Sequence, residues 1–294
     1  MSLASAGNAR ALAAALAVAA SLATAGPASA AWTNARDEFF SINELKFVRS
    51  DGYYDDSGQK RSGDRVDSLE LATWMTYGLT DSVTLLATGG YKFLENRDSG
   101  GSSQGLTKVG GGARIRLWQE GGTVFSVQGL LELNNPEGHK STYLGDDNWS
   151  LETTALLGHS FEAFGLPAFV ASEVGPKFYF GKPADELVMR LNVGGRPMPD
   201  FLTYLSFENK FPISNAQSPY KKVREHKAQL TFVKDITPWL GLSLSGYVTY
   251  AGRNTGQDVA IIPGFWLRIP DALGRGGGEP AGGLGLPAGV GGTR

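Results

Sequence analysis

The strongest constraint on this chain is a pattern of about twelve segments between Phe39 and Ile269, each with apolar residues at every second position. In the clearest segment, the apolar parity holds Val109, Gly111, Ala113, Ile115 and Leu117. The opposite parity carries the charges of Lys108, Arg114 and Arg116. Successive side chains of a strand point to opposite faces, so these segments predict a sheet with one apolar and one charged face. A secreted sandwich and a transmembrane barrel both have such sheets.

The links between the segments separate these two architectures. Links after even segments are short, as at Gly78 to Asp81 and Glu120 to Gly122, whereas those after odd segments are longer, as at Ser50 to Arg65 and Asn134 to Trp149. Bacterial single-chain barrels have short turns on one side, longer loops on the other and an even number of strands, whereas a sandwich has no reason to sort its loops in this way. The pattern therefore favours an all-β transmembrane antiparallel up-and-down barrel of about twelve strands.

The first segment is the least regular. Phe40 and Ile42 share one parity, whereas Leu45 and Phe47 share the other. A bulge near Asn43 would return all four side chains to one face.

The N-terminus has the layout of a secretory signal peptide. Arg10 precedes an apolar run from Ala11 to Ala25, and the small residues Ala28-Ser29-Ala30 follow a proline. We expect residues 1–30 to be cleaved after Ala30. The apolar run is shorter than the roughly 20 residues that a spanning helix needs.

After the last segment the composition shifts to Gly, Pro and Ala, which cannot bury enough apolar surface to become ordered. We therefore expect a barrel over residues 31–269 and a disordered tail over 270–294. Outer-membrane barrels usually end at an aromatic residue that the barrel-assembly machinery reads. In this chain we expect that signal to be displaced inward, with Phe265, Trp266 or Ile269 as its core.

Composition argues against several classes of function. The chain has no cysteine, three histidines and a formal net charge of -2, so it shows neither a Cys-based metal site nor a basic footprint for nucleic acid. No cofactor motif is present. Asp55-Asp56 and Asp146-Asp147-Asn148 fall in expected outer loops and could touch a divalent cation, although such residues more often form turns.

Catalysis is not expected. His159 and Ser160 are adjacent and therefore point to opposite faces of a strand, where they cannot pair. His139 and His226 lie in a loop and at a strand edge, without a supporting serine.

The best candidates for a functional site are the charged residues on the face opposite the apolar one. They are expected to line the lumen: Glu70, Lys92, Lys108, Arg114, Arg116, Glu132, Glu152, Glu173, Lys177, Arg190, Arg196, Glu208 and Lys210. One interpretation is a structural network of cross-strand ion pairs that fills a narrow lumen. The other is a pore lining whose basic excess favours anionic or polar solutes.

Three aromatic residues share the charged parity: Trp74, Tyr179 and Trp266. They could stack an aromatic solute, or they could simply fill the space inside a narrow barrel.

The stretch from Tyr77 to Leu85 reads YGLTDSVTL and resembles the first periplasmic turn of the outer-membrane barrel family named after meta-pathway phenol degradation. Gly105-Leu106 with Arg114 to Trp118 resembles the next hairpin of that family, and Pro183 to Glu186 a later loop. The resemblance implies a transporter or channel in the outer membrane of a Gram-negative bacterium, in contact with lipid and lipopolysaccharide. It also implies passive passage of small solutes and raises hydrophobic or aromatic compounds as candidates. The alternative is a structural or surface-interaction barrel with a blocked lumen.

Overall fold

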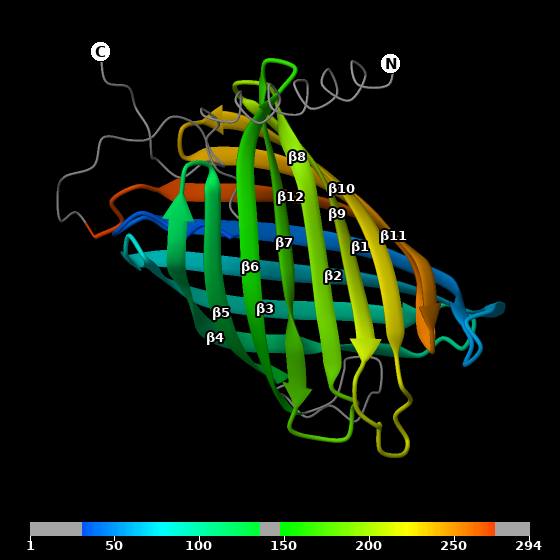
Figure 1. Ribbon diagram of the computed structural model, residues 1–294. Helices are drawn as coiled ribbons and strands as arrows, with labels where there is room; N and C mark the ends of the chain where they lie inside the picture. Colours follow the sequence, from blue (N-terminus) through cyan, green and yellow to red (C-terminus); the bar gives the residue numbers. More distant parts are fainter. Residues whose placement is uncertain (1–30, 136–147, 274–294) are drawn as a thin grey trace, which may run out of the picture.

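The computed structural model describes residues 31–135 and 148–273, which form a closed antiparallel barrel. Its twelve strands are β1 (Phe39–Tyr54), β2 (Lys60–Thr80), β3 (Val83–Asn96), β4 (Ser102–Glu120), β5 (Thr123–Asn134), β6 (Trp149–Ala163), β7 (Leu166–Tyr179), β8 (Glu186–Met198), β9 (Phe201–Pro212), β10 (Arg224–Thr237), β11 (Leu240–Arg253) and β12 (Thr255–Ile269). Each strand pairs with its neighbours in sequence, and β1 pairs with β12 to close the sheet (Figure 1). The predicted twelve-stranded barrel is confirmed.

Several predictions fall outside the described residues. They are the signal peptide over 1–30, the tail beyond residue 273, His139, and the acidic pair Asp146-Asp147. Within the described ranges, no helix is long and apolar enough to cross a membrane.

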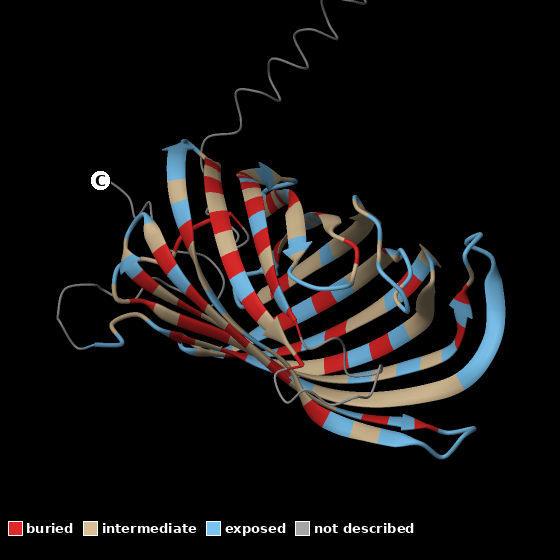
Figure 2. Ribbon diagram, turned by 90° about the horizontal axis from the view of Figure 1, so that it is seen from below, coloured by how far each residue is buried: buried red, intermediate tan, exposed pale blue. Residues whose placement is uncertain are grey.

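The two faces of the sheet are assigned by burial. Apolar residues such as Leu131, Leu244 and Ile261 lie on the outer wall, where 43%, 52% and 62% of their surface is exposed. The residues next to them in sequence, such as Glu132 and Ser245, are buried inside the barrel. Figure 2 shows this alternation as bands along most strands. A soluble sandwich would bury the apolar parity, so this arrangement is that of a barrel with an apolar outer surface.

The predicted bulge near Asn43 is wrong. β1 keeps a continuous register with both β2 and β12 from Phe39 to Ser50, and the irregularity comes only after Ser50. Phe40 therefore faces the interior, where its ring meets that of Trp266 edge to face at 5.5 Å. The parity appeared to break because part of the barrel interior is apolar.

Two of the links after odd strands are shorter than predicted. β1 and β2 continue through the expected loop Ser50 to Arg65, so that only residues 55–59 connect them. β11 and β12 are joined by Asn254 alone, which adopts a positive φ of 53°. Strands that continue beyond the apolar zone face water on both sides and lose the alternation, so their sequence reads as a loop.

The assignment of faces predicts opposite responses to a charge at neighbouring positions of β10. Leu230 lies outward near the middle of the strand, and Gln229 lines the lumen. We expect Leu230→Arg to lower the free energy of unfolding in lipid vesicles by about 2–4 kcal/mol, because the charge would enter the hydrocarbon region. Gln229→Arg is the matched control and should change it far less. Equal effects in urea titrations of the two variants would contradict this assignment.

Candidate functional site

The lumen has two levels of different chemistry. We call the part toward the links after odd strands the upper lumen, and the part toward the short turns and Ala31 the lower lumen. The upper lumen is lined by charged side chains, whereas the lower lumen holds an apolar cluster.

Arg190 on β8 is the centre of the largest ion-pair network in the upper lumen. Its guanidinium lies 2.6 Å from the carboxylate of Glu152, 2.9 Å from that of Glu208 and 3.4 Å from that of Glu173. One arginine thus holds carboxylates from the strands on either side and from β6. The planar guanidinium has five N–H donors and suits such a junction.

The network continues along the wall through lysines. Glu132 on β5 accepts from Lys177 at 2.8 Å and pairs with Lys108 at 3.4 Å. Lys210 on β9 lies 3.1 Å from both Glu208 and Glu225. The Lys210–Glu208 pair lies within β9, and the other pairs join adjacent strands or strands with one strand between them, so the network follows the wall instead of crossing the lumen.

A cavity of about 500 Å³ lies between this network and the opposite wall. Lys46, Glu70 and Lys92 contribute to it from β1, β2 and β3, and Arg190 and Lys227 from β8 and β10. Lys92 and Glu70 pair with each other at 3.6 Å along their own wall. The upper lumen is therefore an open polar chamber with alternating charges on its surface.

The lower lumen is filled. Its apolar cluster consists of Ala31, Trp32, Phe40, Val124, Leu156, Phe169, Ala171, Leu202, Val233 and Trp266. These residues come from β1, β5, β6, β7, β9, β10 and β12 and from the segment before β1, so the cluster reaches from one wall to the opposite one. Trp32 belongs to this cluster and is only 4% exposed.

Residues 31–38, which we call the N-terminal segment, are held inside the lower lumen by specific hydrogen bonds. Arg114 donates from Nη1 to the carbonyl of Trp32 at 3.0 Å, and Ser126 donates from its hydroxyl to the carbonyl of Ala31 at 2.6 Å. Gly158 leaves room for the indole: a Cβ at this position would lie 2.4 Å from the Trp32 ring. The segment is thus a fitted plug.

Two buried ion pairs lie near the end of the plug. Glu38 pairs with Arg268 of β12 at 2.7 Å, and Arg196 of β8 pairs with Asp235 of β10 at 2.9 Å. All four side chains are more than nine-tenths buried. Glu38 thereby ties the end of the N-terminal segment to the last strand.

The structure sorts the charged residues predicted from the sequence into groups. The upper lumen brings together Glu70 with Lys92 and, on the other wall, Lys108, Glu132, Glu152, Glu173, Lys177, Arg190, Glu208 and Lys210. Arg114 instead holds the plug, with its Nε and Nη2 donating to Gln128. Arg196 lies in its buried pair, and Arg116 bonds to Gln119 beside the β4–β5 turn.

The three predicted aromatic residues do not share one site. Trp266 belongs to the apolar cluster, and Trp74 lies at the same level, since both flank Ile42 of β1 in register. Tyr179 lies at the upper end of β7, where its hydroxyl donates to Glu186 at 3.3 Å and the ammonium of Lys177 is 5.5 Å from its ring.

Sequence reasoning missed several inward charges. They are Glu38, Glu44, Lys46, Glu186, Glu225, Lys227, Asp235 and Asp258. Most of them are acidic, so they offset the basic excess of the predicted set. Several lie at strand ends that looked like loops, and only the register between strands could have assigned them to the lumen.

His159 and Ser160 do not form a catalytic pair. Ser160 is buried inside the barrel, whereas His159 bonds to the hydroxyl of Thr123 at 2.7 Å and stacks on Phe161. His226 lies between the rings of Phe211 and Tyr250. Within residues 31–135 and 148–273, no group of three or more His, Asp or Glu is placed to hold a metal ion.

Asp55 organises the β1–β2 link, outside the spanning strands. Its carboxylate accepts hydrogen bonds from the Ser57 hydroxyl and from Arg61 Nε, both at 2.7 Å, and from the amide of Gln59 at 2.9 Å. These bonds, that of Ser57 foremost, hold the pKa of Asp55 well below its usual range. Asp55 is thus engaged within the link and favours the turn-forming interpretation of Asp55-Asp56 over a cation site.

The fold is similar to that of solved outer-membrane barrels. An outer membrane channel from Pseudomonas putida F1 matches with a TM-score of 0.66 and 13% sequence identity over 82% of this chain and 98% of the other. The NanC porin matches with a TM-score of 0.51 and 8% identity over 77% of this chain and all of the other. No protein-family model and no curated relative matches the chain, so the resemblance to the phenol-degradation family is not confirmed. At such identities the likeness establishes the fold.

Proposed function

We propose that this protein is an outer-membrane channel of a Gram-negative bacterium for the passive passage of small solutes. The observation that supports this best is the upper lumen, where ion pairs run along the walls and leave a polar chamber of about 500 Å³ between them. A barrel that served only as a scaffold would gain nothing from an open, charged chamber, since filling it with apolar side chains is at least as stable. The outward apolar belt and the fold shared with outer-membrane channels support the location.

The N-terminal segment makes this channel narrow or closed at its lower end. Its apolar cluster supports the possibility, raised by the family resemblance, that hydrophobic or aromatic solutes pass, with Trp74 and Trp266 near their path. The same cluster supports the rival function, a structural or surface-interaction barrel with a blocked lumen.

The proposed partners follow from the location. The outer wall contacts membrane lipid and lipopolysaccharide, and the barrel-assembly machinery inserts the chain. The assembly signal would lie near Phe265 to Ile269, at the end of β12.

Planar bilayers and liposome swelling test the proposal. We expect the wild-type barrel to give small single-channel currents with weak ion selectivity, because acidic and basic side chains nearly balance in the lumen. Small sugars should enter vesicles slowly. Silent bilayers and no swelling, both for the wild type and for a variant without the N-terminal segment, would favour the blocked barrel.

A further inference from the structure

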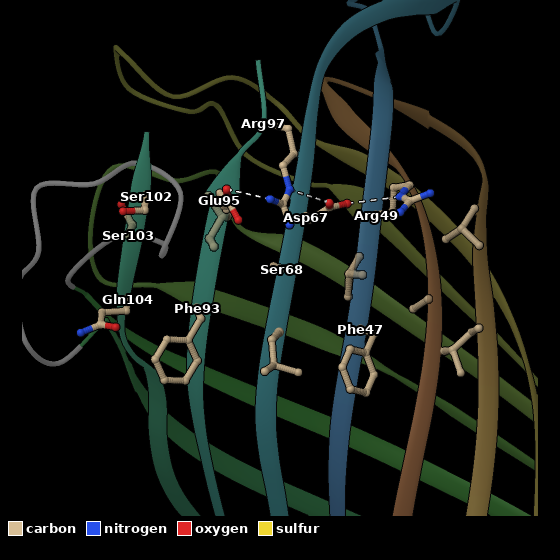
Figure 3. Close-up of a pocket in the computed structure, with 16 residues that line it drawn as sticks. Phe47, Arg49, Asp67, Ser68, Phe93, Glu95, Arg97, Ser102, Ser103 and Gln104 are labelled. Atoms are coloured by element: carbon tan, nitrogen blue, oxygen red, sulfur yellow. Dashed lines mark hydrogen bonds and ion pairs between the residues drawn. The ribbon is translucent and has the colours of Figure 1, made fainter. Parts of the chain in front are cut away.

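The outer wall formed by β12 and β1 to β4 has a groove of about 1030 Å³. Its floor is apolar and includes Phe47, Leu69, Phe93 and Ile261. Phe47 and Phe93 are nearly half exposed, and Figure 3 shows their rings at the same level on β1 and β3. These residues belong to the outward parity, so the groove is separate from the lumen.

A cluster of arginines forms the upper rim of this groove. Asp67 on β2 accepts from Arg49 Nε at 3.2 Å, from Arg65 Nη2 at 3.0 Å and from Arg97 Nε at 3.1 Å. Figure 3 shows the chain of contacts from Glu95 through Arg97 and Asp67 to Arg49. The Asp67 side chain is 22% exposed, whereas those of Arg49 and Arg97 are 54% and 51% exposed. One carboxylate therefore lies beneath and gathers three guanidinium groups that reach outward.

The arginines of the rim have more N–H donors than their contacts with Asp67 and Glu95 use. A guanidinium has five N–H donors, and Arg49 uses its Nε on Asp67 while Arg97 uses Nε on Asp67 and Nη1 on Glu95. Arg65 also lies in the field of Asp51 and Asp98, so Arg49 and Arg97 are the better placed pair for a further anion. Phosphate has several acceptor oxygens and matches the fork geometry of a guanidinium, so it suits such a pair of arginines.

The spacing of floor and rim fits an amphiphile. Phe47 and Arg49 are two residues apart on β1, as are Phe93 and Glu95 on β3. A strand rises about 3.3 Å per residue, so the charged rim begins about 7 Å above the apolar floor. A lipid likewise has apolar acyl chains next to a charged headgroup. A free phosphate has no apolar part that could contact the floor of the groove.

We propose that this groove binds one phosphate-bearing acylated glycolipid of the outer leaflet. Its acyl chains lie over Phe47, Phe93 and Ile261, and its phosphate lies against the guanidinium groups of Arg49 and Arg97. The proposal rests on the outer-membrane location proposed above and goes beyond it, because it assigns a specific lipid site in place of general contact with the bilayer.

Native mass spectrometry of the full barrel in a non-ionic detergent tests the site. The probes are lipid A with its two phosphates and the same lipid after removal of both. We expect one bound lipid A, held about tenfold more tightly than the dephosphorylated form. Arg49→Gln combined with Arg97→Gln should weaken lipid A about tenfold. Arg116→Gln, at the β4–β5 turn and away from the groove, is the matched control and should leave binding unchanged.

The proposal is overturned if both lipids bind equally, if the double variant binds like the wild type, or if inorganic phosphate alone occupies the site equally well. Dimers that form without lipid and bury the groove would assign it to a second copy of the chain. Heat-modifiable migration on a gel checks that each variant is folded, and Phe93→Ser, with the rim intact, should also weaken lipid A. Conductance is a separate readout: a barrel that binds lipid A and does not conduct contradicts only the channel proposal.

Discussion

Removal of the N-terminal segment should raise the single-channel conductance several-fold. Trp32 of this segment belongs to the buried apolar cluster of the lower lumen, whose members come from opposite walls of the barrel. Without the segment, the ion path would extend from the polar upper chamber through the lower lumen. We suggest refolding in detergent a chain that starts at Glu38, which keeps the pair with Arg268 and lacks the rest of the segment, and comparing its conductance and sugar uptake with those of a chain that starts at Ala31.

Two arginine variants distinguish an effect of releasing the plug on the conductance from an effect of removing a positive charge. Arg114→Ala removes the donor to the Trp32 carbonyl, whereas Arg116→Ala removes an equal charge from a side chain that bonds to Gln119. We expect Arg114→Ala to increase both the conductance and its fluctuations, and Arg116→Ala to resemble the wild type. An increase of the same size in both variants would mean that charge, and not the plug, controls the current.

The barrel could be predicted from the sequence because its two faces differ at every second residue. Val109 to Leu117 shows the rule most clearly, and the exposed apolar parity follows it around the sheet. The plug could not be predicted in this way. Trp32 lies before the first strand, where no periodicity applies, and the residues that hold the plug, such as Ser126 against Ala31 and Gly158 against Trp32, are ordinary strand residues in sequence. Only the closed barrel brings them together.

The lumen illustrates a second limit of the sequence. Parity placed Glu152, Arg190 and Glu208 on the charged face, yet it gave no information on which charges pair. Pairing depends on the register and the stagger of the strands. At Arg190 of β8, they bring the carboxylates of Glu152 from β6 and Glu208 from β9 to one guanidinium. Charge selectivity therefore could not be read from a count of the inward lysines and arginines.

Arg190→Met should produce a large loss of stability. It would leave the carboxylates of Glu152, Glu173 and Glu208 close together without their common cation, and removal of one partner from a buried ionic group typically costs about 3–5 kcal/mol. Because the arginine side chain is 27% exposed to the chamber, we expect a value of about 3 kcal/mol, at the lower end of that range.

The same change should turn the weak ion selectivity toward cations, since three carboxylates would then face the solute path. Lys46→Met is the matched control: it removes one luminal cation that pairs with Glu44 at 3.5 Å, and it should alter both quantities much less. Urea titration in lipid vesicles gives the free energy of unfolding, and the reversal potential in a salt gradient gives the selectivity. If Arg190→Met and Lys46→Met behaved alike in both measurements, Arg190 would not be the junction of the network, and the charges would act as independent surface groups. If only stability fell, the network would be structural, and the solute path would lie away from it, along the wall of β1 to β3.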